Sequence, residues 1–123
     1  MTDADLQNLE TDQLVDRFAA IGVSQYRAND ADDDREYKRL FYQMDDIQKE
    51  LKKRPGDQRR ALVKLFDYPN MQVRLMAAQY SLAVVPEAAH QAIEAIAAST
   101  WAPQCYDARV CLRMLRDGTF IPD

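Results

Sequence analysis

The chain has 123 residues, enough for one domain that buries roughly two thirds of the surface of its unfolded form without metal or disulfide support. Three glycines and five prolines are too few for the many tight turns of a β-sandwich, and the composition favours helix. The net charge is −4, the N-terminus is acidic and no apolar run approaches the length of a membrane span, so we expect neither a secretory signal nor a membrane-spanning segment. We expect a soluble, cytoplasmic, all-α protein of about six helices, forming a single domain over residues 1–123.

Charge is distributed unevenly along the chain. Residues 1–36 carry a net charge of −7, residues 37–74 of +5 and residues 75–123 of −2. This asymmetry is compatible with a patch that binds a polyanion, but the acidic first segment can equally lie against the basic second one. We favour the second arrangement.

Residues 1–54 are expected to form a pair of long helices, of which the first runs from about Asp12 toward Tyr26. Thr11 precedes it as an N-cap, and Gly22 weakens the prediction of its second half. Its apolar positions recur at helical spacing: Leu9, Leu14, Phe18 and Ile21.

The second long helix follows the acidic run Asp30–Asp34, whose carboxylates suit a helix N-terminus. It ends with Lys52, Lys53 and Arg54, cations that suit a helix C-terminus, and Pro55 stops it. Its apolar stripe is the most regular of the chain: Tyr37, Leu40, Phe41, Met44, Ile47 and Leu51.

A helical hairpin is expected over residues 55–85. Its first helix starts near Asp57, spans about ten residues and should expose Arg59, Arg60 and Lys64. The buried side is predicted to hold Ala61, Leu62, Leu65 and Phe66.

The second helix of this hairpin follows the turn Asp67-Tyr68-Pro69-Asn70, in which Asn70 or Asp67 can cap it. It carries apolar residues on two opposite sides, and only two narrow polar slits remain. The slits hold Gln72 with Gln79 and Arg74 with Ser81. A helix of this kind must be packed between two layers, so Val73 and Leu82 are expected to be buried.

A second, less regular hairpin is expected over residues 86–118, followed by a tail at 119–123. Pro86 opens its first helix, and Ala89, Ile93, Ile96 and Ala97 form the apolar stripe. The last helix runs from about Gln104 to Arg116, and Gly118 suits a left-handed cap. Cys105 and Cys111 diverge around this helix, so we expect two buried, reduced thiols.

The two hairpins resemble HEAT repeats. Residues Asp67, Pro69, Val73-Arg74, Ala77-Ala78 and Leu82 match the HEAT pattern, and Asp107, Arg109 and Leu112 are its remnants in the second hairpin. The whole chain is similar to a family of short bacterial proteins, a domain of unknown function with HEAT-like helices, through Arg54–Leu62 and Pro86–Ala89. This resemblance implies an α-α superhelix and brings no catalytic residue.

Arg74 and Arg109 occupy matching positions of the two hairpins. We expect both to tie the loops of adjacent units together rather than to bind a ligand, with Asp67 or Asp107 as carboxylate partners. Asp67, Pro69, Asn70, Val73, Arg74, Leu82 and Arg109 are therefore assigned structural roles.

Motifs for catalysis or metal binding are weak. The run from Asp30 lacks the glycine and glutamate that a calcium loop needs at its sixth and twelfth positions, where Arg35 and Phe41 stand. Glu87 and His90 have the spacing of a di-iron ligand pair, but His90 is the single histidine. We expect no catalytic residue, no metal and no cofactor.

Recognition of another protein is the function that these patterns favour. Trp101 and Tyr106, with Arg59 and Arg60, are our candidate partner contacts, because exposed aromatic side chains commonly anchor interfaces. An alternative within this class is an immunity protein that neutralises a neighbouring toxin. A second alternative is weak nucleic-acid binding through the basic cluster Lys49–Arg60, although the pI near 5.0 argues against it. We expect a monomer or a weak homodimer.

Overall fold

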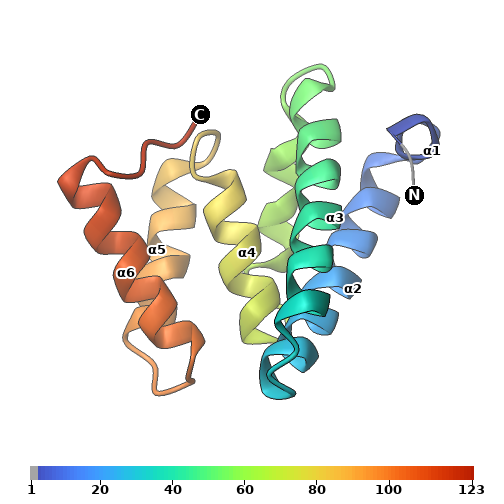
Figure 1. The fold of residues 1–123 in the computed structure, drawn as a ribbon. Coiled ribbons are helices and arrows are strands. Elements are labelled where there is room, and N and C mark those ends of the chain that lie inside the picture. Colours follow the sequence, from blue (N-terminus) through green and yellow to red (C-terminus); the bar gives the residue numbers. More distant parts are fainter. Residues whose placement is uncertain (1–2) are drawn as a thin grey trace. The chain divides into compact units, whose positions relative to one another are not determined.

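The structure, a computed structural model, describes residues 3–123 and is entirely helical over that range, which confirms the all-α prediction (Figure 1). The elements are α1 (Asp3–Gln7), α2 (Thr11–Asp30), α3 (Asp34–Lys53), the 3₁₀ helix η1 (Gln58–Leu65), α4 (Met71–Ser81), α5 (Pro86–Ala97) and α6 (Gln104–Asp117). None of these helices combines the length and the apolar character needed to span a membrane.

The chain divides into two compact units between Leu62 and Val63, within η1. Helices α1, α2 and α3 belong to the first unit, and α4, α5 and α6 to the second. Folding as a single domain stays a prediction.

In the first unit α2 and α3 lie side by side as a hairpin (Figure 1). Helix α2 continues through Gly22 to Asp30, four residues beyond the expected end, since packing along α3 outweighs the cost of about 1 kcal/mol that a glycine brings. Its N-cap is Glu10 rather than Thr11, because the backbone N–H of Glu10 donates to Oε1 of Gln13 (2.9 Å).

The acidic run forms the turn between α2 and α3. Asp32 takes a left-handed conformation (φ 54°), and the N–H of Asp33 donates back to the Ala28 carbonyl (2.8 Å). The Asp33 carboxylate then accepts from the N–H of Glu36 (3.1 Å) and caps α3. The expected capping role of this run is confirmed.

Most residues of the predicted stripes are buried in the core of the first unit, but Leu9, Ile21 and Tyr37 are only half-buried and Phe41 lies outside it. Phe41 is 42% exposed, because it lies at the edge of the α3 stripe. The buried apolar side chains of α2 and α3 are Leu14, Val15, Phe18, Ala19, Ala28, Leu40, Met44, Ile47 and Leu51.

Arg54 joins α1 to the end of α3. Its guanidinium donates to the carbonyls of Leu6 (3.1 Å) and Leu9 (2.6 Å), to Oγ1 of Thr11 (3.3 Å) and to the buried carboxylate of Glu50 (2.8 Å). Burial alone would raise the pKa of Glu50, but hydrogen bonds from Arg54 and Lys53 outweigh it and lower the pKa.

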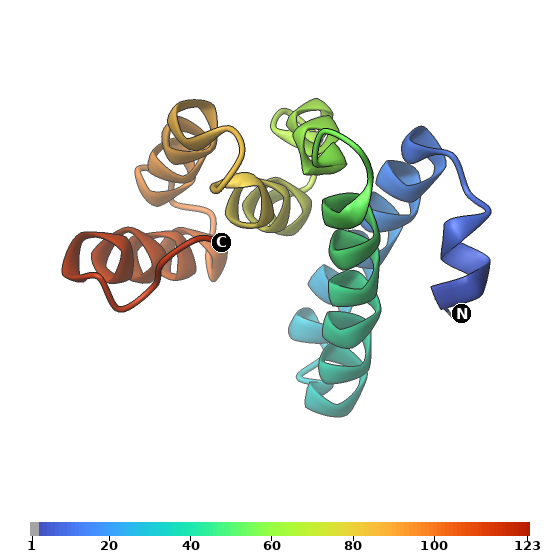
Figure 2. The same ribbon diagram turned by 90° about the horizontal axis from the view of Figure 1, so that it is seen from above.

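In the second unit α4 packs against α5 and α6, and α5 packs against α6 (Figure 2). The two apolar sides of α4 are buried as expected, but Gln72 and Ser81 of the expected polar slits are buried too. Both find internal partners: Oε1 of Gln72 accepts from Gln104 (3.1 Å), and Oγ of Ser81 donates to the Ala77 carbonyl (2.7 Å). Hydrogen bonding thus removes the need for solvent at these two positions.

Several details of the second unit match expectation. The Asn70 side chain accepts from the N–H groups of Gln72 (3.0 Å) and Val73 (3.2 Å) at the start of α4. Gly118 ends α6 in a left-handed conformation (φ 75°). The α5 stripe is buried, and Cys105 and Cys111 are free and buried, with burial raising the pKa of the Cys111 thiol.

We predict that Asn70→Ala destabilises the protein by about 1 kcal/mol, because two N–H groups at the start of α4 lose their acceptor. Asn70→Asp is the matched control, since its carboxylate keeps the acceptor. Urea unfolding followed by circular dichroism measures both. Equal stability of the alanine variant and the wild type would contradict the capping role.

Leu82→Ala should cost about 2 to 5 kcal/mol, because the side chain is only 5% exposed and its removal leaves a cavity. Ala83→Gly, at the neighbouring exposed position, is the control for backbone effects. A negligible loss for Leu82→Ala in the same unfolding assay would contradict burial on this side.

The Glu50 ion pair predicts a pH dependence of stability. A carboxylate whose pKa is lower in the folded state stabilises the fold above its unfolded pKa, and the contribution is lost as the pH falls through the folded value. The difference in unfolding free energy between wild type and Glu50→Gln should therefore be largest near pH 7 and shrink below about pH 4. Glu36→Gln removes an exposed ion pair with Arg39 and should show little change at either pH.

Candidate functional site

The largest exposed aromatic side chains of the second unit lie on and just before α6. Trp101 is 50% exposed, Tyr106 59% and Val110 41%. Tyr106 and Val110 are four residues apart on one face of α6. Trp101 lies in the loop before α6, and its carbonyl accepts from the N–H of Cys105 (2.9 Å). We call Trp101, Tyr106 and Val110 the aromatic face.

Arg109 supports the Tyr106 ring of this face. Its guanidinium carbon lies 5.5 Å from the centre of the Tyr106 ring, and its Nε donates to the Ala97 carbonyl at the end of α5 (2.9 Å). The guanidinium of Arg109 is therefore held by the Ala97 carbonyl. The Tyr106 ring packs on a cation whose position is already fixed.

The prediction that carboxylates pair with Arg74 and Arg109 is wrong, because both arginines donate to backbone carbonyls. Nε of Arg74 donates to the Tyr68 carbonyl (2.6 Å), and the Asp67 group within reach is its backbone carbonyl (3.5 Å). Partial burial raises the pKa of Asp107. The carbonyls are fixed in direction by the backbone, so they hold a guanidinium without ordering a second flexible side chain.

The expected exposure of Arg59 is wrong as well. Arg59 is 5% exposed and makes a two-point ion pair with Asp57, Nε to Oδ1 (2.9 Å) and Nη2 to Oδ2 (2.7 Å). This pair, with burial opposing it, lowers the pKa of Asp57. Arg60 is exposed, and its Nε donates to the Gly56 carbonyl (2.9 Å). η1 is a 3₁₀ helix with a different side-chain period from the expected α-helix, which changes the side on which Arg59 lies.

Internal carboxylates neutralise much of the basic cluster. Lys49 lies 2.9 Å from Asp45, and Lys53 and Arg54 lie 3.0 and 2.8 Å from Glu50. These cations are already paired, so nucleic acid would have to displace the carboxylates.

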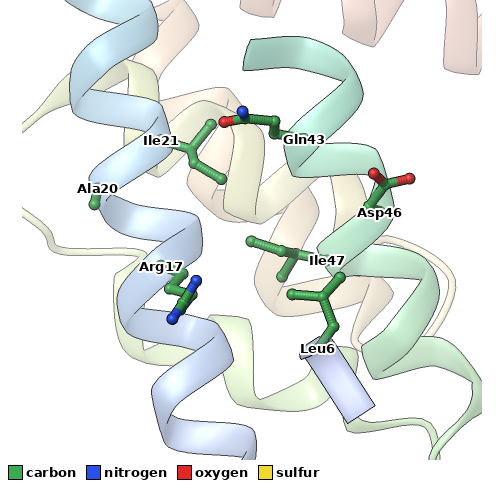
Figure 3. Close-up of a pocket in the computed structure, with 7 residues that line it drawn as sticks. All are labelled: Leu6, Arg17, Ala20, Ile21, Gln43, Asp46 and Ile47. Carbon is green, nitrogen blue, oxygen red and sulfur yellow. The ribbon is translucent and has the colours of Figure 1, made fainter. Parts of the chain in front are cut away.

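A pocket of about 310 Å³ lies in the first unit between α1, α2 and α3 (Figure 3). Ile21 of α2, Ile47 of α3 and Leu6 of α1 form its apolar part. Its remaining lining residues are Arg17, Ala20, Gln43 and Asp46. Its volume is at the small end of ligand pockets. Sequence reasoning missed it because three helices contribute to it, and α1 was not expected.

His90 lies on the exposed side of α5. Its Nδ1 is 2.9 Å from Oε1 of Glu94, four residues later. Within residues 5–123, whose side chains are described, no cluster of three His, Cys, Asp or Glu side chains is arranged to hold a metal ion.

The fold is that of a solved structure. The crystal structure of the protein RPA1889 from Rhodopseudomonas palustris CGA009 is 49% identical, with a TM-score of 0.93, and the match covers 96% of this chain and 98% of that one. No curated protein matches the chain. The family model for DUF2019, a domain of unknown function, matches residues 12–116. The chain therefore belongs to the DUF2019 family.

Proposed function

We propose that this protein is a non-enzymatic interaction module that binds another protein through the aromatic face of its second unit. The observation that carries the proposal is Tyr106, a large side chain that is 59% exposed yet held by Arg109. Trp, Tyr and Arg are the residues that most often supply binding energy in protein interfaces. A side chain fixed before binding loses less conformational entropy when a partner docks.

We also propose that the second unit is built from HEAT-like elements. The support is a repeated hydrogen bond: Arg74 of α4 and Arg109 of α6 each donate Nε to a carbonyl of the preceding segment, Tyr68 and Ala97. Helices α4, α5 and α6 pack on one another in order, as stacked hairpins do. Such an element leaves a face of its last helix exposed, and here that face carries Tyr106 and Val110.

The test is an affinity capture from an extract of the native host, followed by mass spectrometry. We expect at least one host protein to be captured by the wild type and lost with a Trp101→Ala/Tyr106→Ala variant. Removing two exposed aromatic anchors should weaken binding by about 2 kcal/mol or more.

The matched control is Phe41→Ala/Tyr42→Ala, which removes the exposed aromatic pair of the first unit, whose rings lie 5.7 Å apart. This variant should capture the same protein as the wild type, and thermal melts of all three proteins check that they are folded. Equal capture by the Trp101/Tyr106 variant would contradict the proposal.

A further inference from the structure

We infer that the partner of the aromatic face is an acidic protein segment, whose carboxylates meet Arg113 and Arg116 while an apolar side chain packs on Tyr106 and Val110. This inference rests on the proposed function and adds the chemistry of the partner. The order of charges on α6 supports it, as does the exposure of Arg113 and Arg116.

Three arginines follow the aromatic residue along one side of α6. Arg109, Arg113 and Arg116 are spaced by four and three residues, the spacing of neighbours on one helix face, and Tyr106 lies three residues before the first. The row spans about 10 Å along the axis at 1.5 Å per residue. An apolar platform and a short row of cations therefore adjoin one another.

The three arginines differ in what already binds them. Arg109 is held by the Ala97 carbonyl and the Tyr106 ring. Arg113 and Arg116 are exposed, and within the described part of the chain neither side chain makes an ion pair or a hydrogen bond. Asp117, four residues after Arg113, is also exposed and does not pair with it. These two guanidiniums are available to a partner.

Several cations of the first unit differ from Arg113 and Arg116 because internal carboxylates neutralise them. There Lys49, Lys53, Arg54 and Arg59 each lie within 3.0 Å of an internal carboxylate. On α6, by contrast, the cationic row faces outward beside aromatic side chains. A partner that carries carboxylates can supply the charge that complements this row.

A protein segment fits this face better than a nucleic acid. Two arginines form a short cationic site, whereas sequence-independent nucleic-acid binding relies on many phosphate contacts, and the chain as a whole carries a net charge of −4 that repels a polyanion. A guanidinium matches a carboxylate through two parallel hydrogen bonds, so two acids and one apolar anchor suffice for a specific contact.

The experiment is a display selection against the immobilised full chain, with random 15-residue peptides as the probe. We expect the enriched peptides to be acidic and to contain an apolar or aromatic residue. Arg113→Glu/Arg116→Glu should weaken their binding by about tenfold or more, because like charges then face each other, and added salt should weaken the wild-type complex.

The matched control is Arg35→Glu/Lys38→Glu, which makes the same charge change at exposed positions of α3 and should leave peptide binding unchanged. Circular dichroism checks that both variants keep their helix content.

The outcomes separate this inference from the proposed function. Enriched peptides without acids, lost with Trp101→Ala/Tyr106→Ala but not with Arg113→Glu/Arg116→Glu, would overturn the acidic partner and leave the aromatic face as the binding site. Peptides indifferent to both double variants would overturn both. Tighter binding of a labelled 20-nucleotide RNA through Arg113 and Arg116, or self-association in sedimentation that Arg113→Glu/Arg116→Glu abolishes, would replace the acidic partner by nucleic acid or by a second copy.

Discussion

Hydrogen bonds from arginine side chains to backbone carbonyls are the interaction on which the order of this helical fold depends. Helix ends and turns leave carbonyls without partners, and a protein with three glycines has few left-handed caps to satisfy them. Arg54 serves the carbonyls of Leu6 and Leu9, Arg74 that of Tyr68, and Arg109 that of Ala97. In each case one planar cation fixes the direction of a neighbouring segment.

These bonds also determine what the surface can do. A guanidinium held by a carbonyl keeps its full charge, because the carbonyl is neutral and no carboxylate cancels it. Arg109 can thus position a ring and still contribute positive potential to α6. Arg54 differs, because the Glu50 carboxylate neutralises its charge. It holds α1 against the end of α3 and adds little positive potential to the surface.

Apolar periodicity was sufficient to predict helices α2 to α6 and much of the core, but neither α1 nor the 3₁₀ form of η1. The α5 stripe and the Asn70 cap follow directly from sequence, because apolar spacing and capping residues are local signals. The partners of Arg74 and Arg109 do not, since every residue has a carbonyl and the sequence cannot show which one is near. Arg59 was misplaced because an eight-residue apolar pattern fits a 3₁₀ helix and an α-helix equally well.

The same division applies to the candidate sites. The exposure of Trp101 and Tyr106 could be anticipated from their place in and after a loop, because large side chains there have few neighbours to cover them. The support of Tyr106 by Arg109 depends on where α5 ends relative to α6. The pocket at Ile21 and Ile47 depends on α1. This helix has five residues, too few for its apolar periodicity to be recognised in the sequence.

The two cysteines give α6 a chemical reporter on the side away from its exposed face. Cys105 and Cys111 are 2% and 5% exposed, so a thiol reagent can reach them only when the helix detaches from α5 or α4. The rate of their labelling therefore measures the opening of this one helix. A ligand that docks on the opposite side and stabilises α6 would slow that rate without competing with the reagent for the same surface.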